Sequence, residues 1–451
     1  VNVCLQVRRR RLVQDGARMN KSLEPAIGCA RLRGRSPSRR NKMTTPIQAR
    51  TKALPPIAEF IALVALISSL VALSIDAMLP ALPQIASDLG VQDMRQTQWV
   101  ITSLIFGMSF GQLFFGPLSD SYGRKFGILT GILLFCLGSM LSMLATSLPM
   151  LLVGRVLQGI GVAGPRIASL ALVRDIYVGD AMARVMSFVM MVFIMVPMVA
   201  PLVGQAVLLA FSWRAIFALF ILLSAVSALW LVIRQPETLG VANRRPFHFK
   251  TIWRTTVAVV RHPRVLGFSL TAGLIFGALL SYVASAQAIF QGIYQLGEAF
   301  PFYFGALAFG IGLASFANSW LVVRFGAERL SVLGLWGLLF FTLLLTLVAF
   351  FNQGIPPLAT FMSLGFLMFF CVGILFGNLN ALAMVPLGRM AGIGAAVVGS
   401  VSNVVAVLVS ALVGWFYNDT LLPILLGISV CTLVALIIVW WIRALPDTPL
   451  E

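Results

Sequence analysis

The chain has 451 residues, of which 59% are apolar and 11% are charged, and its mean hydropathy is +0.95. Soluble domains are usually about 45–50% apolar and about 25% charged, so this composition excludes a soluble globular protein and predicts a membrane protein with several spans. The net charge is +18, but +12 of it belongs to residues 1–54. The excess charge therefore does not indicate a nucleic-acid partner.

Residues 1–54 form an Arg-rich tail, with 14 Lys/Arg against two acidic residues. Such a segment cannot build a core, so we expect a disordered, solvated cytosolic tail; contact with anionic lipid or RNA is the alternative. Met43 begins a stretch typical of a short cytosolic leader, so part of the tail is expected to be upstream sequence rather than working protein. No apolar run of the signal-peptide type follows Arg8–Arg11.

Twelve apolar runs follow the tail, and each has about the 20 residues that a helix needs to cross a bilayer. They cover residues 57–79, 97–117, 127–147, 150–172, 185–208, 215–233, 265–289, 301–323, 330–351, 358–384, 393–416 and 422–442. We therefore predict an all-α membrane protein with twelve transmembrane helices.

The interval 234–264 is the longest between two spans. It is predicted to be a cytosolic linker between an N-terminal half, 55–233, and a C-terminal half, 265–443, with residues 444–451 as a second cytosolic tail. The halves also resemble each other, because Gly123 after the second span matches Gly326 after the eighth, in similar surroundings and at an offset of 203 residues. Two parallel six-helix halves are typical of transporters, whose substrate site lies at the interface of the repeats.

The distribution of basic residues predicts the orientation. With a cytosolic N-terminus, the inner segments hold 29 Lys/Arg and the outer loops hold two, Arg95 and Arg214, while Arg155 and Arg166 lie within a span. Such an asymmetry sets the orientation of a membrane protein. Both termini are therefore expected in the cytosol.

Several stretches carry a family resemblance. The first signature motif of the major facilitator superfamily is similar to Gly116-Pro-Leu-Ser-Asp120-Ser-Tyr-Gly123-Arg124-Lys125, between the second and third spans. The second motif is similar to Leu152-Val-Gly-Arg155-Val-Leu-Gln158-Gly159-Ile-Gly161, and the antiporter motif of drug exporters to Pro197-Met-Val-Ala-Pro201-Leu-Val-Gly204. Four further stretches together resemble the bicyclomycin-resistance (Bcr/CflA) type of drug/proton antiporter. They are Ser74-Ile-Asp76-Ala-Met-Leu-Pro80-Ala-Leu-Pro83, Arg174-Asp175-Ile-Tyr177, Trp213-Arg214-Ala-Ile-Phe217 and Met390-Ala-Gly392.

The resemblance implies a proton-coupled secondary transporter that exports small amphipathic or apolar drugs across a bacterial inner membrane by alternating access. Its energy source would be the proton gradient, with no bound cofactor, and its partners would be the drug, protons and the lipid bilayer, with the chain as a monomer. Bicyclomycin, phenicols and sulfonamides are the first substrate guesses. Asp120 and Arg124 would form a cytosolic latch between the halves, with Gly116, Gly123 and Lys125 in the same loop.

Asp76 most needs a physical explanation, because a carboxylate within a span costs about 2.5–3.5 kcal/mol and normally faces a cavity or a partner. Arg155 is predicted at a depth only about 3 Å different. We therefore expect Asp76 to be the proton-accepting or cation-binding group and Arg155 to be its switchable counter-ion. Two alternatives are a static ion pair that locks two helices and a carboxylate solvated at the headgroup level.

Pro197 and Pro201 each remove a helix hydrogen bond, and with Gly204 they predict a bendable fifth span, or else a permanent kink. Two residues depart from the family pattern. Arg166 replaces a small residue and is expected either to tune selectivity at the inner end of the cavity or to extend to the cytosolic interface. Gln205 replaces a second glycine of the antiporter motif.

The substrate cavity is predicted from polar and soft residues within the spans. Its expected members are Gln158, Met195, Ser281, Ser285, Gln287, Asn378 and Asn403, although lipid-facing packing is the commoner fate of a methionine. The sequence has no metal-ligand cluster, no Ser/His/Asp constellation and no phosphate-binding G-x-x-x-x-G-K-[ST] loop, so neither an enzyme nor an ATP-driven pump is expected. A metabolite exporter or importer of the same fold is the nearest alternative, and a non-transporting membrane sensor is a more distant one.

Overall fold

The structure is a computed structural model that describes residues 55–240, 244 and 246–445. The regular elements of these residues are all helices, and twelve of the helices are long and apolar enough to cross a membrane. They coincide with the twelve predicted spans, so the prediction of a twelve-span all-α membrane protein is confirmed. The tail 1–54 lies outside the described residues, as does the C-terminal tail apart from residues 444 and 445.

The first six spans are built from eight main helices and turns. They are α2 (Ile57–Asp76), η1 (Leu79–Ala81), α3 (Leu82–Asp88), α4 (Gln98–Tyr122), α5 (Arg124–Met143), α6 (Leu148–Ile176), α7 (Gly179–Ala210) and α8 (Arg214–Arg234). The last six spans are α10 (Pro263–Gln287) with η4 (Ala288–Ile293), α11 (Phe300–Phe325), α12 (Ala327–Phe351), α13 (Leu358–Met384), α14 (Ala391–Trp415) and α15 (Leu422–Arg443). The term linker end is used below for the end of the helix bundle where α4 is followed by α5 and α8 is followed by the linker. The opposite end of the bundle is called the far end.

The first span is longer and less regular than predicted. It continues to Asp88 rather than ending at residue 79. The α-helix itself stops at Asp76, and the chain then turns through η1 and α3, whose first turns contain Pro80 and Pro83. Proline has no N–H to donate, so these two residues break the helix inside the span. Asp76 therefore lies at a helix break rather than three residues from the end of the span.

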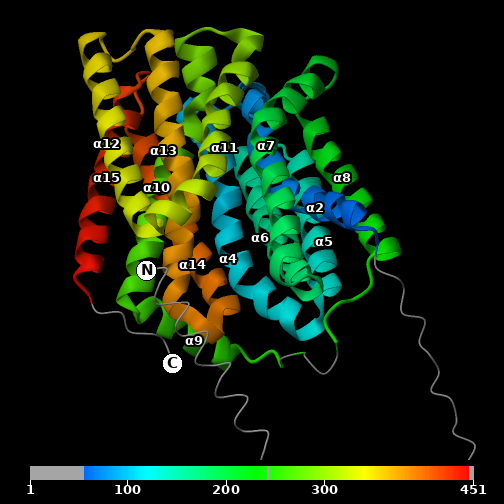
Figure 1. Cartoon of the computed structure of the whole chain (residues 1–451). Coiled ribbons are helices and arrows are strands. Elements are labelled where there is room, and N and C mark those ends of the chain that lie inside the picture. The colour runs from blue at the N-terminus through cyan, green and yellow to red at the C-terminus, as the bar shows by residue number, and fades with distance from the viewer. Residues whose placement is uncertain (1–54, 241–243, 245, 446–451) are drawn as a thin grey trace, which may run out of the picture. The chain divides into compact units, whose positions relative to one another are not determined.

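The linker between the halves contains a helix that the sequence prediction lacks, α9 (Phe249–Arg261), which is drawn in Figure 1 at the linker end. Its basic residues Lys250, Arg254 and Arg261 share one face, and its Val259 is buried. The helix packs against α10 and α14 of the second half.

The two sets of six helices repeat the same packing. Four closely packed pairs before the linker, α5 with α6, α4 with α6, α2 with α7 and α5 with α8, have counterparts after it in α12 with α13, α11 with α13, α10 with α14 and α12 with α15. Counted by span, these are the same pairs. Gly123 and Gly326 occupy equivalent turns, and both have the positive φ that favours glycine, at 113° and 80°. The halves meet where α4 lies beside α14 and α7 beside α11 (Figure 1).

Candidate functional site

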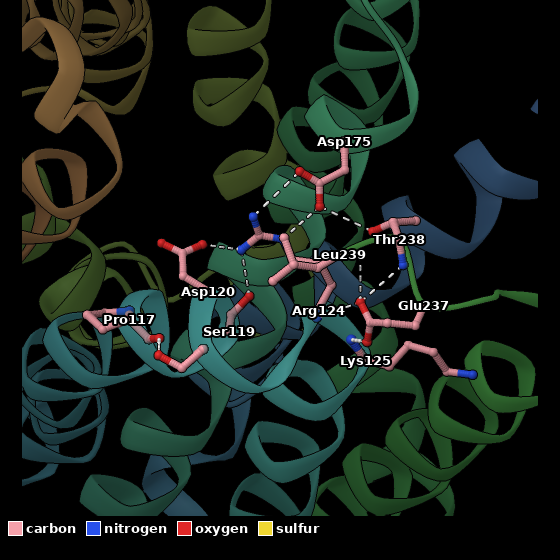
Figure 2. A network of polar contacts seen from close by, with 10 residues as sticks. Pro117, Ser119, Asp120, Arg124, Lys125, Asp175, Glu237, Thr238 and Leu239 are labelled. Carbon is pink, nitrogen blue, oxygen red and sulfur yellow. Dashed lines mark hydrogen bonds and ion pairs between the residues drawn. The ribbon is translucent and has the colours of Figure 1, made fainter. Parts of the chain in front are cut away.

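The signature motif of the α4–α5 turn forms a polar network around Arg124, which is 8% exposed. Figure 2 shows its guanidinium between the carboxylates of Asp120 and Asp175, with Nε 2.8 Å from Asp175 Oδ2. Nη1 also donates to Ser119 Oγ at 3.0 Å. The contacts of Arg124 therefore tie α4, α5 and α6 together at the linker end of the first half.

Glu237, just after α8, closes this network from the linker side. Its carboxylate accepts the backbone N–H groups of Arg124 at 2.9 Å and Lys125 at 3.1 Å (Figure 2). These are the first two residues of α5, whose N–H groups have no partner within the helix. Gly123 makes the approach possible, because a Cβ at this position would overlap the Glu237 carboxylate.

The latch predicted between the halves takes a different form in the structure. Arg124 makes its described contacts within the first half, and Asp120 is the residue that faces the second half. A Cβ placed on Gly392 would stand 4.0 Å from Asp120 Oδ2, and one placed on Gly116 would stand 3.8 Å from Ala396 Cβ. Gly392 lies in the first turn of α14, where the positive end of the helix dipole attracts a carboxylate.

Asp76 is 5% exposed, so the alternative of a carboxylate solvated at the headgroup level is wrong. It ends α2, about 28 Å along that helix from Ile57. Its carboxylate has no hydrogen bond or ion pair with any residue that the structure describes. The turn η1 that follows Asp76 packs against α10 of the second half, where Tyr282 is buried.

Arg155 does not pair with Asp76 in the described structure, so the predicted counter-ion contact is absent. Its Nε donates to Val100 O at 2.8 Å, Nη2 to Ser74 O at 2.8 Å and Nη1 to Gln158 Oε1 at 2.6 Å. Arg155 and Asp76 do lie at similar depths, because Ser74, whose carbonyl accepts from Arg155, is only two residues from Asp76. Side chains two residues apart on a helix point in nearly opposite directions, however, so a contact with the Ser74 carbonyl does not bring Arg155 to the Asp76 carboxylate.

Gln158 is completely buried, and both the oxygen and the nitrogen of its side-chain amide form hydrogen bonds. It accepts from Arg155 and donates from Nε2 to Ser139 Oγ at 2.8 Å. Together with the backbone acceptors of Arg155, this chain of contacts joins α2, α4, α5 and α6. Gln158 is therefore part of the packing of the first half, buried away from the surface in this arrangement.

The antiporter motif of α7 lies against the helix break after Asp76. The helix is continuous through Pro197 and Pro201. Gly204 is required for packing, because a Cβ there would overlap Ala77 O. Gln205, where the family prefers glycine, is half-buried on the same helix.

The predicted cavity residues of the second half do not form one group. Ser285 Oγ accepts from Gln98 Nε2 of α4 at 3.0 Å, whereas Ser281 bonds to its own helix at Gly277 O. Asn378 exchanges two hydrogen bonds with Asn318 of α11, at 2.8 and 3.2 Å. Asn403 is buried with an Nδ2 group that has no hydrogen-bond partner. Met195 of α7 is 51% exposed.

A cavity of about 740 Å³ lies between the halves at the far end. Its lining includes Gln287 and Gln98 together with Asp93 and Tyr417. The side chain and backbone N–H of Arg95 donate to Asp93 and hold the pKa of that carboxyl below its usual value. Burial raises the pKa of Tyr417 to about 12. The cavity wall therefore carries a neutral phenol and an ionised carboxylate at neutral pH.

Sequence reasoning missed four residues of these networks: Gln98, Asp175, Glu237 and Tyr282. Asp175 appeared only within the family resemblance, without a role, and Glu237 follows a span in a short Pro-Glu-Thr stretch. Tyr282 had a usable signal, because a tyrosine hydroxyl in the middle of an apolar run is costly to bury, and this hydroxyl is buried without a hydrogen-bond partner among the described residues.

The family profile that matches this sequence is that of the Major Facilitator Superfamily, over residues 64–410. The chain belongs to the major facilitator superfamily. Its structural neighbours agree with this at the level of the fold: the crystal structure of a D-xylose-proton symporter matches with a TM-score of 0.69, covering 87% of this facilitator and 98% of that chain at 14% identity.

The relatives of this facilitator include several resistance proteins. It is 31% identical to the bicyclomycin resistance protein homolog of Haemophilus influenzae, over 85% of this chain and 96% of that protein. It is 28% identical to the chloramphenicol resistance protein of Pseudomonas aeruginosa, over 80% and 87%, and 26% identical to multidrug resistance protein D of Escherichia coli, over 72% and 81%. The resemblance to the bicyclomycin-resistance type is thus confirmed.

Proposed function

We propose that this facilitator exports small, largely apolar drugs by alternating access, driven by inward proton flow across the bacterial inner membrane. Both termini would lie in the cytosol, which makes the linker end the cytosolic end. The drug specificity is supported by the relatives' names, which include resistance to bicyclomycin and chloramphenicol. The proton gradient supplies about 2.3 kcal/mol per charge for each 100 mV of membrane potential.

The observation that carries the proton coupling is the position of Asp76. It is buried at a break in the first span, its carboxylate has no hydrogen-bond or ion-pair partner among the described residues, and the turn η1 that follows it packs against α10 of the opposite half. A carboxylate at the contact between two moving halves changes its surroundings when they move. Such a change in burial or in neighbouring groups is what loads and releases a proton.

The contacts between the halves support alternating access. At the linker end, Asp120 of α4 lies beside the first turn of α14. Near the far end, Gln98 of α4 donates to Ser285 of α10. We propose that the first contact breaks in the inward-open state and the second in the outward-open state. The Gln98–Ser285 hydrogen bond costs on the order of 1 kcal/mol to break, so it would not lock the inward-open state.

The test uses inverted membrane vesicles with an imposed pH gradient that is followed by a quenched dye. Bicyclomycin and chloramphenicol are added to the wild type, to Asp76→Asn and to Asp88→Asn. Asp88 is a matched control, because it lies on the same span but is 38% exposed and bonded to Arg214. We expect drug-dependent discharge of the gradient in the wild type and in Asp88→Asn, and none in Asp76→Asn.

The other outcomes separate the parts of the proposal. If Asp76→Asn discharges the gradient like the wild type, drug export stands and Asp76 does not couple it. If no drug of the panel produces a response in the wild type although the protein is present in the membrane, proton-coupled drug export is wrong.

A further inference from the structure

The function proposed above assigns no role to Arg166, a cation within the first half. It lies on α6, 11 residues after Arg155, which places it on the same face about 16 Å nearer the linker end. Its Nη1 lies 3.6 Å from Met108 Sδ of α4, and its guanidinium stands 6.0 Å from the centre of the Phe193 ring of α7. The side chain therefore lies among three helices of the first half.

The direction of the side chain argues against its extending to the membrane surface. α6 runs from the far end to the linker end, and side chains on a helix lean toward its N-terminus. Arg166 is 10 residues from the linker end of α6, about 15 Å. The atom that it contacts belongs to Met108, which is 14 residues from the linker end of α4, about 21 Å. The guanidinium thus points toward the middle of the bundle.

The charge of Arg166 has no counterpart in the described structure. Arg155, on the same helix, donates to two backbone carbonyls and an amide oxygen, and Arg124 is held by two carboxylates. Arg166 has only a thioether and an aromatic ring, and no carboxylate of the described residues lies within 4.0 Å of it. A guanidinium in an apolar environment is stable only when acceptors fill its donor positions. Arg166 is partly exposed.

We propose that Arg166 binds a carboxylate or sulfonate group of the transported molecule. The guanidinium presents two parallel N–H donors to such a group, while Met108 and Phe193 contact an apolar or aromatic body attached to it. This inference rests on the proposed drug export and specifies its substrates as amphipathic anions. Export of such an anion in exchange for protons moves one more charge per cycle than export of a neutral drug, so it depends more steeply on the membrane potential.

The test compares two molecules that share one scaffold, neutral chloramphenicol and its anionic hemisuccinate ester. Equilibrium binding and transport are measured on the full chain, in nanodiscs and in proteoliposomes. The wild type is expected to bind the hemisuccinate at least about 10-fold more tightly than chloramphenicol. Arg166→Gln is expected to lose this preference while binding of chloramphenicol changes less than about 2-fold, and Arg166→Lys is expected to keep part of it.

Arg174→Gln is the matched control, because it removes the same charge from the last turn of α6, where the side chain is exposed. It should keep the wild-type preference. Arg166→Met, which keeps an unbranched side chain without charge, replaces Arg166→Gln if that variant does not fold. Equal binding of the two compounds by the wild type overturns the anion site without any variant, as does an unchanged preference in Arg166→Gln.

Failure of the inference and failure of the proposed function give different results. If chloramphenicol is transported and the anion is not preferred, drug export stands and the anion site is wrong. If the wild type transports neither compound and the Asp76 assay is also negative, the proposed drug export is wrong and the anion site falls with it.

Discussion

Glu237 is expected to be a main stabiliser of the linker end, and Glu237→Gln tests this. The carboxylate accepts four backbone N–H groups, from Arg124, Lys125, Thr238 and Leu239, at 2.9 to 3.1 Å. Glutamine keeps one acceptor oxygen and places an NH₂ group where the other was. At least one of the contacts at the start of α5 is therefore lost, and the remaining ones are no longer assisted by charge.

The size of the effect follows from these contacts. A hydrogen bond to a charged group contributes about 1.5–3 kcal/mol and a neutral one about 0.5–1.5, and a negative charge at a helix N-terminus adds about 0.3–1 kcal/mol. Because Glu237 is exposed and solvent weakens its contacts, we take the lower end of these ranges and expect a loss of about 2 kcal/mol in the free energy of unfolding. For a chain of this size this corresponds to a melting temperature lower by roughly 3 °C.

The assay is thermal unfolding of the purified full chain in detergent, at one scan rate because membrane proteins unfold irreversibly. Hydrogen exchange at the first turn of α5 is measured in parallel. Glu328→Gln is the matched control: it lies in the first turn of α12, the equivalent helix of the second half, and its ion pair with Arg443 is half-exposed. Such pairs contribute about 0–1 kcal/mol, so its melting temperature should shift by less than about 1 °C.

The reasoning is refuted if Glu237→Gln and Glu328→Gln have the same melting temperature. It is also refuted if Glu237→Gln is destabilised but exchange at the first turn of α5 stays at the wild-type rate, because the loss would then arise elsewhere.

Three further predictions concern packing, the buried arginine and pH. Gly204→Ala should lower the free energy of unfolding by about 1–3 kcal/mol, because the new Cβ would overlap the backbone after Asp76. Gly292→Ala is the control and should lower it by less than about 1 kcal/mol, because no atom lies within 4 Å of a Cβ there. Thermal unfolding of the two variants tests this difference. Arg155→Lys should destabilise the chain by about 2–4 kcal/mol, because one ammonium cannot reach all three acceptors of the guanidinium and leaves buried acceptors unpaired; equal melting temperatures would contradict it. The folded state holds the proton of Tyr417 up to a pKa of about 12, whereas the unfolded chain releases it near pH 10. Stability is therefore unaffected below pH 10 and falls by about 2–3 kcal/mol between pH 10 and 12, and Tyr417→Phe should show a smaller fall in unfolding experiments over that range.

The sequence by itself determined the class of the protein and its spans. Apolar runs of about 20 residues have few alternatives to membrane helices, because every backbone polar group in a bilayer must be satisfied within the protein. The sequence also revealed the linker, the repeat of Gly123 and Gly326, and the family motifs. These features depend on local spacing and on backbone conformations that glycine favours, so they can be recognised without the tertiary structure.

Only the tertiary structure decided which groups face each other. Asp76 and Arg155 have similar depths, as the sequence indicated, but depth along a helix does not give the direction of a side chain around it. The structure buries Asp76 just before the turn η1, which packs against α10 of the second half, and uses Arg155 to join helices of the first half. Glu237 reaches α5 across more than a hundred residues, a contact that no local pattern predicts. Arg166 points toward the middle of the bundle, because the chain direction of α6 sets which way its side chains lean.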